Sequence, residues 1–279
     1  MNYSNINFHI NKQIAFVELS RAEKHNAIDM TTFIEINDVI KVIAKDKSIR
    51  AVIVSGRGED YCSGIDVKAI FNSPKHALKL LFKWFPWQSN LAQKVSTGWR
   101  KLPVPVIFAM HGRCWGAGIQ IALGGDFRIA TPDASISIME AKWGLIPDMG
   151  GTLALREVLP LDVAKELAMT AKVLSGQEAL SLNLLTKVAE NPLVKAIEMA
   201  DEISKYSPDS IAACKKLYNK SWWGSAGMAL ARESIYQIKV FLGKNYKIKS
   251  YNQTKEKQTK NNNAGDEITL KPFKPRMKW

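Results

Sequence analysis

The sequence predicts an α/β fold, and two observations carry that prediction. Up to Pro160, short apolar segments rich in β-branched residues alternate with helix-like patterns, as expected of strands and helices packed in layers. After Pro160 the strand-like segments stop and helix-like segments follow one another. At 279 residues the chain is long enough for one large domain, or for a domain with an appendage.

The predicted strands are short apolar runs bounded by turn residues. Three of them cover residues 13–19 (QIAFVEL), 51–55 (AVIVS) and 105–110 (PVIFAM), and their composition is typical of buried strands. Two further strands are predicted at residues 127–130 and 135–139.

The first predicted helix begins after Asp29, a residue type that caps helix N-termini. Five apolar residues follow at helical spacing and form one stripe: Phe33, Ile36, Val39, Ile40 and Ile43. Beyond Pro160, helices are predicted at residues 162–170, 176–182, 193–206, 209–221 and 226–242. The C-terminal part should therefore be mostly helical.

Composition argues against a membrane or metal protein. No apolar run approaches the ~18 residues that span a bilayer, and the opening segment MNYSNINFHINK is too polar for a signal peptide, so a cytoplasmic protein is expected. Cys62, Cys114, Cys214 and four histidines show no metal-ligand spacing. We therefore expect no metal site.

The net charge of +13 is concentrated near the C-terminus. Residues 244–279 carry ten Lys or Arg against three Asp or Glu, and residues 244–265 are polar and rich in Lys and Asn. Such a composition buries little apolar surface, so a basic, flexible tail is expected. Whether this tail contacts a neighbouring subunit, phosphate groups, nucleic acid or nothing stays open, and nucleic acid is the least favoured of these.

Two glycine-containing turns each lie between a predicted strand and a helix-like segment. They are residues 61–66 (YCSGID) and 114–126 (CWGAGIQIALGGD). Such turns leave backbone N–H groups pointing outward, and the start of a helix favours negative charge there. Because neither GxGxxG nor a P-loop is present, the turns suit a developing oxyanion better than a phosphate. Close packing of the chain is the alternative.

Two carboxylates lie next to apolar segments. Glu140 follows the strand-like ISIM, and Asp148 lies in the glycine-rich loop GLIPDMGG. A carboxylate at the end of a buried strand is a candidate for a raised pKa and for proton transfer. The alternatives are a solvated acid at Glu140 and a turn-forming side chain at Asp148.

Four segments, in this order, resemble the crotonase superfamily (the enoyl-CoA hydratase/isomerase family) from about residue 16 to residue 186. They are SRAEKHNAI (20–28), GRGEDYCSGIDVKAI (56–70), PVIFAMHGRCWGAGIQIALGGDFRIATPDA (105–134) and MEAKWGLIPDMGGT (139–152). Four motifs in the right order and spacing are a specific sign of the family, and a less specific sign of the reaction.

The resemblance implies a core of repeated ββα units wound into a spiral, followed by an α-helical trimerisation region. On this basis residues 1–200 are expected to form the acyl-CoA-binding core, residues 201–243 the trimerisation region and residues 244–279 the basic tail. It further implies an acyl-CoA thioester as substrate and no separate cofactor, because coenzyme A is part of the substrate. The implied assembly is a trimer or a dimer of trimers, and the implied context is fatty acid or related acyl-CoA metabolism.

The resemblance also implies site residues. In the family, two backbone N–H groups hold the thioester oxygen, and they correspond here to Ile65 and Ala117. Further contacts to the substrate fall on five residues of the same motifs: Lys24, Ala27, Gly64, Asp66 and Gly116. The aromatic residues Trp84, Phe85 and Trp87 are candidates for lining an acyl pocket, or for plain core or interface packing.

The chain departs from the family pattern at one catalytic position. Many hydratases of the family carry two glutamates, which correspond here to Gln120 and Glu140. An amide does not transfer a proton as a carboxyl does, although it can orient water. In the dienoyl-CoA isomerases of the family, a carboxylate corresponds to Asp148. The sequence therefore leaves open hydration by Glu140 with help from Gln120, slightly ahead on family frequency, and double-bond isomerisation by Glu140 and Asp148.

Overall fold

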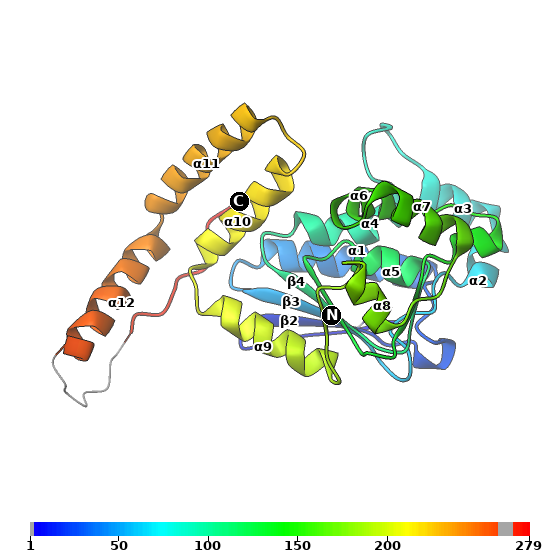
Figure 1. Ribbon diagram of the computed structural model, residues 1–279, viewed down its shortest axis with the longest axis horizontal. Helices are drawn as coiled ribbons and strands as arrows, with labels where there is room; N and C mark the ends of the chain where they lie inside the picture. Colours follow the sequence, from blue (N-terminus) through cyan, green and yellow to red (C-terminus); the bar gives the residue numbers. More distant parts are fainter. Residues whose placement is uncertain (1–2, 262–269) are drawn as a thin grey trace.

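The computed structural model describes residues 3–261 and 270–279 (Figure 1). Its main sheet has the strand order β1-β2-β3-β4-β6-β8, in which β1 is antiparallel to β2 and all other neighbours are parallel. A separate parallel pair is formed by β5 and β7. The strands are β1 (Ile6–Asn11), β2 (Ile14–Leu19), β3 (Ala51–Gly56), β4 (Val106–Met110), β5 (Arg113–Trp115), β6 (Phe127–Ala130), β7 (Ser135–Ser137) and β8 (Lys187–Val188).

Helices cover both faces of the sheet and form the C-terminal part. They are η1 (Ala22–Lys24), α1 (Met30–Lys45), α2 (Val67–Phe71), α3 (Pro74–Leu81), α4 (Leu91–Lys101), α5 (Ala117–Ala122), η2 (Glu140–Trp143), α6 (Gly151–Val158), α7 (Leu161–Thr170), α8 (Gly176–Ser181), α9 (Pro192–Ser204), α10 (Pro208–Ser221), α11 (Ala226–Phe241) and α12 (Lys244–Asn261). Within the ranges that the structure describes, no helix has both the length and the apolar composition that a bilayer crossing requires.

Alternate residues of the central strands point into two different layers. Val52 and Val54 of β3 join the main core together with the apolar stripe of α1, whereas Ala51 and Ile53 pack toward α9 on the opposite face. Figure 1 shows α9 on one side of the sheet and α1, α4 and α5 on the other. The period of two along each strand explains this division.

The predicted α/β fold is confirmed, with strands at all five predicted places. The first long helix begins where expected, because the Asp29 side chain accepts a hydrogen bond from the Thr32 N–H at 2.8 Å. Three strands, β1, β5 and β8, were not predicted. The first of them, β1, carries alternating Ile6, Phe8 and Ile10, a period-two signal that would have revealed it. The five predicted C-terminal helices correspond to α7 to α11.

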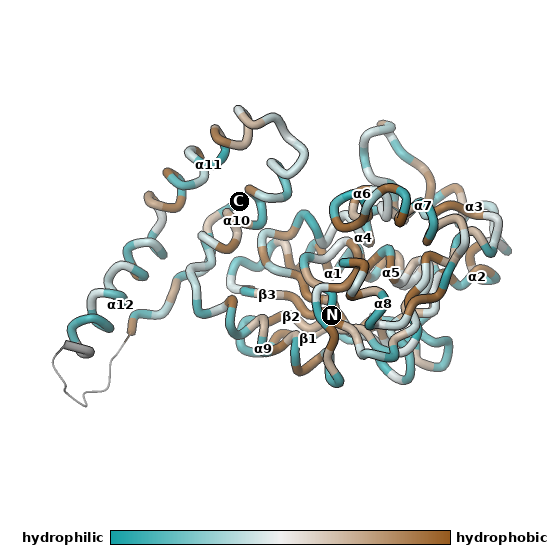
Figure 2. The backbone as a smooth tube through the Cα atoms, in the orientation of Figure 1, coloured by the Kyte–Doolittle hydropathy of each residue, from teal (hydrophilic) through white to brown (hydrophobic). Residues whose placement is uncertain are grey.

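The C-terminal helices α11 and α12 extend away from the sheet (Figure 1), and α12 is predominantly hydrophilic (Figure 2). The expectation that residues 244–265 do not order themselves is corrected by α12, which covers residues 244–261. The remaining residues of that segment, 262–265, lie outside the described ranges. The division into core, trimerisation region and tail stays a prediction.

Side-chain amides explain why the polar helix α12 is held in place. Asn245 exchanges two hydrogen bonds with the backbone of Lys274, and Asn252 does the same with Lys271. Farther along this C-terminal segment, the buried Arg276 donates to the carbonyl oxygens of Asp46 and Ile49. Hydrogen bonds to backbone groups thus supply what the composition of the segment lacks in apolar surface.

Candidate active site

The two glycine-containing turns lie side by side. Cys62 forms a parallel bridge with Cys114, since the Cys62 N–H donates to the Arg113 oxygen at 2.9 Å and the Trp115 N–H donates to the Cys62 oxygen at 3.0 Å. Gly64 has φ +108°, and a Cβ atom built there would lie 3.2 Å from the Trp115 oxygen. Glycine is therefore required where the first turn passes the second.

In each turn the predicted backbone donor is unused. The backbone of Ile28 is hydrogen-bonded to the two residues that flank Ile65. The Ile28 N–H donates to the Gly64 oxygen, and the Asp66 N–H donates to the Ile28 oxygen. The Ile65 N–H therefore points away from this pair of bonds. Ala117 begins α5, ahead of the first helical hydrogen bond. Within residues 3–261 and 270–279, neither the Ile65 nor the Ala117 N–H donates a hydrogen bond.

Glu140 lies buried beside the second turn, at the start of η2 and with 8% of its surface exposed. Its Oε1 accepts a hydrogen bond from Gln120 Nε2 at 2.5 Å, and its Oε2 is buried without a hydrogen-bond partner among the described residues. A Cβ atom on Gly116, which has φ +49°, would approach Glu140 Oε1 to 3.4 Å. Burial raises the pKa of Glu140, and the nearby charge of Asp148 adds to this rise.

Gln120 connects Glu140 to the loop that follows it. The amide is 1% exposed, and its oxygen accepts a hydrogen bond from the Met149 N–H at 2.9 Å. A Cβ atom on Gly151 would lie 3.0 Å from the same oxygen, so the glycine leaves room for the amide. Gln120 thus fixes one oxygen of Glu140. This contact was not predictable from the sequence, because twenty residues separate the pair.

An apolar cavity of about 150 Å³ lies next to the first turn. Its lining includes Phe33, Ile65, Ile70, Leu80, Ile146 and Asp148. Asp148 also borders a second hollow of about 400 Å³, and burial raises the pKa of its carboxyl. Trp87 borders that second hollow, but neither Trp84 nor Trp87 lines the apolar cavity, and both are more than 80% exposed.

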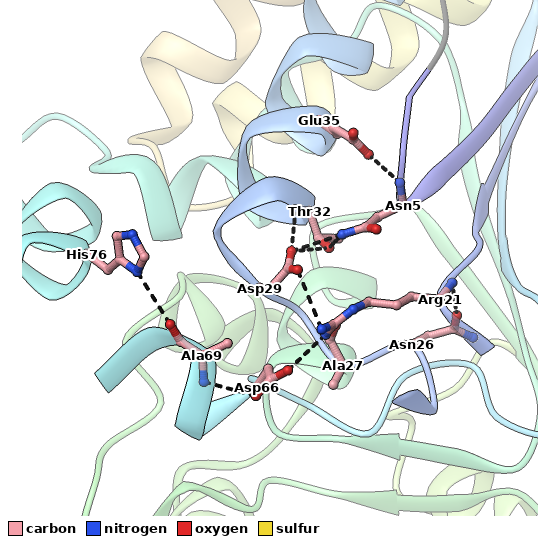
Figure 3. A network of polar contacts seen from close by, with 10 residues as sticks. All are labelled: Asn5, Arg21, Asn26, Ala27, Asp29, Thr32, Glu35, Asp66, Ala69 and His76. Carbon is pink, nitrogen blue, oxygen red and sulfur yellow. Dashed lines mark hydrogen bonds and ion pairs between the residues drawn. The ribbon is translucent and has the colours of Figure 1, made fainter. Parts of the chain in front are cut away.

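Among the remaining predicted contacts, Ala27 and Asp66 lie around the first turn (Figure 3). Lys24 is exposed in η1, and the Ala27 oxygen accepts a hydrogen bond from Arg21. Asp66 uses both carboxylate oxygens within the protein, because it accepts from the Ala69 N–H at 3.1 Å and from Arg21 at 2.9 Å. Although burial alone would raise the pKa of Asp66, these two donors lower it.

Sequence reasoning missed two features of this region. Arg21 contacts Ala27 and Asp66 beside the first turn and was not singled out, although an arginine eight residues before the predicted helix cap Asp29 is a usable signal. The bond between Gln120 and Glu140 was also missed. Among the residues that the structure describes, no group of His, Cys, Asp and Glu side chains is arranged to hold a metal ion.

Comparison with known proteins identifies the family. The family model described as enoyl-CoA hydratase/isomerase matches residues 9–262. Carnitinyl-CoA dehydratase of Proteus mirabilis (strain HI4320) is 33% identical over 198 residues, covering 70% of this chain and 73% of the relative. Carnitinyl-CoA dehydratase of Escherichia coli (strain K12) is 31% identical over 211 residues, covering 75% and 77%.

Solved structures share the fold. A putative enoyl-CoA hydratase from Streptomyces coelicolor A3(2) superposes with a TM-score of 0.83 at 24% identity, covering 91% of this chain and 93% of that one. Enoyl-CoA hydratase from Thermoplasma volcanium GSS1 gives 0.78 at 26% identity, with coverages of 86% and 94%. The chain therefore belongs to the enoyl-CoA hydratase/isomerase family of the crotonase superfamily, whose members act on acyl-CoA thioesters.

Proposed function

We propose that this protein catalyses reversible addition of water to an enoyl-CoA thioester. Glu140 acts as the acid/base, and the N–H groups of Ile65 and Ala117 hold the thioester oxygen. The observation that carries the proposal is the Glu140 carboxyl, which is buried beside the Ala117 turn with one oxygen fixed by Gln120 and the other without a partner among the described residues.

The chemistry of the thioester explains why this arrangement suits the reaction. Adding or removing a proton at the carbon next to the carbonyl passes through an enolate, whose negative charge develops on the thioester oxygen. Two fixed N–H donors stabilise that charge without reorganising, and loss of one such donor costs about 10²–10³ in rate. A carboxyl whose pKa is raised toward the working pH both accepts and returns the proton.

Addition of water is favoured over isomerisation by the curated relatives, which are named carnitinyl-CoA dehydratases, enzymes of water removal. The apolar cavity beside Ile65 would take the acyl chain, and Lys24 and Ala27 would contact the coenzyme A moiety. A trimer or dimer of trimers built through the C-terminal helices, and a place in fatty acid or related acyl-CoA metabolism, belong to the same proposal.

Double-bond isomerisation is the second candidate function, and one observation favours it. Asp148 is partly buried, lines the apolar cavity, and has a raised pKa of its own. It also interacts electrostatically with Glu140. Two such carboxyls along one acyl chain would move a proton from one carbon to another.

Activity assays on the purified protein test the proposal. Wild type and Glu140→Gln should be assayed with 2-enoyl-CoA thioesters for water addition and with 3-enoyl-CoA thioesters for double-bond migration. We expect water addition by the wild type and a loss of about 10²–10⁴ in Glu140→Gln. Glu166→Gln, at an exposed position of α7, is the matched control and should leave turnover unchanged.

Either of two results would contradict the proposal. Undiminished turnover in Glu140→Gln would remove the assigned role of that residue. Double-bond migration without water addition, abolished by Asp148→Asn, would replace hydration by the second candidate.

A further inference from the structure

Arg21 makes three contacts around the first turn (Figure 3). Its Nη1 donates to the Ala27 oxygen at 3.0 Å and to Asp66 Oδ2 at 2.9 Å, and its Nη2 lies 3.6 Å from Asp29 Oδ2. The side chain is 17% exposed. One guanidinium therefore joins two segments of the chain, residues 27–29 and Asp66.

Both segments border Ile65. Asp66 follows Ile65 directly and caps α2, while Asp29 caps α1. Ala27 precedes Ile28, which bonds to the backbone on both sides of Ile65. Because the Ile65 N–H has no hydrogen bond within the described ranges, its direction is set by the bonds of its neighbours.

The first turn needs such an external constraint. Gly64, with φ +108°, gives the backbone before Ile65 wide conformational freedom. The helix after the turn, α2, is five residues long, too short to be stable by itself. A planar guanidinium that bonds to a carbonyl and a carboxylate together supplies a directional restraint that a lysine ammonium does not reproduce.

We infer that Arg21 is a positioning residue, which aims the Ile65 N–H by clamping Ala27, Asp29 and Asp66 around it. This inference rests on the proposed function for its catalytic consequence, and its structural part is testable without any turnover. Arg21 touches no reacting atom and acts through Ile65.

Hydrogen–deuterium exchange tests the clamp directly. The protected amides are those of Ile28 and Asp66, which bond across the two segments, and of Ala69, which bonds to the Asp66 side chain. In Arg21→Gln we expect exchange of these amides to accelerate about tenfold or more, because charge-assisted hydrogen bonds are lost. Unchanged exchange in these segments would overturn the inference.

Two further variants and a control sharpen this test. Asp66→Asn keeps a residue type that caps helices well but loses its charge pair with Arg21, and it should accelerate exchange at Ile28. Arg21→Lys should give an intermediate effect. Arg50→Gln is the control, because Arg50 donates to the carbonyl oxygens of Ser204 and Tyr206 far along the chain and should leave the first turn unchanged.

Kinetics test the catalytic consequence. Arg21→Gln should lower kcat about 10- to 100-fold, by misaligning one donor, and should change KM less. The red shift of a bound chromophoric aryl-enoyl-CoA, which reports polarisation of the thioester carbonyl, should shrink in parallel, and Arg21→Lys should restore part of it. If the wild type is active and Arg21→Gln shows a normal kcat and a normal red shift, the inference is overturned. If the wild type is inactive, the proposed function is refuted, and the exchange experiment alone decides whether Arg21 holds the first turn.

Discussion

The two turns of the site present the same group, a free backbone N–H, and are held in place by different forces. The turn before α5 is enclosed by core: Ala117, Gly118, Ile119 and Gln120 are all buried, and no side chain caps the helix. The turn before α2 lies nearer the surface. Asp66 caps that helix and forms an ion pair with Arg21, and the side chains of Arg21 and Asp66 are 17% and 21% exposed.

This difference shows that equivalent donors need not have equivalent supports. At the second turn, close packing against backbone leaves almost no space for added side-chain atoms, because protein interiors are packed as densely as organic crystals. Ion pairs near the surface restrain direction but add little to overall stability. We therefore expect substitutions at the second turn to cost folding free energy, and substitutions around the first turn to act locally.

The largest expected effect on stability comes from overfilling the packed turn. A Cβ atom on Gly118 would lie 2.8 Å from the Cys62 oxygen and 2.9 Å from the Cys62 Cβ, so the backbone of one turn would have to move. Gly118→Ala should lower the free energy of unfolding by about 1–3 kcal/mol, measured by urea denaturation.

A second helical glycine provides the matched control. Gly227 lies in α11, and a Cβ atom built on it has no described residue within 4 Å. Gly227→Ala should cost no stability and gain up to about 1 kcal/mol from helix propensity. Equal stability of the two variants would mean that packing does not hold the second turn.

A smaller effect on the free energy of unfolding should arise from the buried carboxyl of Glu140. Its pKa in the folded protein is raised above the ordinary 4.5, so the folded state binds the proton more tightly than the unfolded chain. Stability from this group is therefore present at low pH and is lost as the pH rises through the folded pKa. Glu140→Gln should be more stable than wild type at neutral pH, and the difference should vanish toward pH 4.5.

Denaturation curves of both proteins between about pH 5 and pH 8 check this. A difference that does not change with pH would show that the carboxyl carries no burial penalty, and would weaken its assignment as a proton carrier.

The sequence predicted the elements whose signals are local. Short apolar runs rich in β-branched residues identified β2, β3 and β4, a helical stripe identified α1, and the glycines marked both turns. The close approach of Gly64 to the Trp115 backbone was not predictable from the spacing of these residues in the sequence, since it depends on how segments far apart in the chain pair.

Long-range polar contacts account for most of what was missed. Gln120 reaches Glu140, Arg21 reaches Asp66 across 45 residues, and Arg276 reaches Asp46 across 230. From its composition, the segment that begins at Lys244 was predicted to be flexible, because it has little apolar surface to bury. Composition does not reveal the hydrogen bonds that its asparagine side chains make to the backbone of a neighbouring segment.

The central claim is that the two turns stabilise a thioester enolate and that Glu140 moves its proton. A saturated acyl-CoA such as butyryl-CoA neither takes up water nor shifts a double bond, so exchange of its α-hydrogens in D₂O reports the enolate alone. Followed by proton NMR, wild type should exchange these hydrogens and Glu140→Gln should be slower by about 10²–10⁴. Absence of exchange with wild type, or equal exchange with both proteins, would contradict the account.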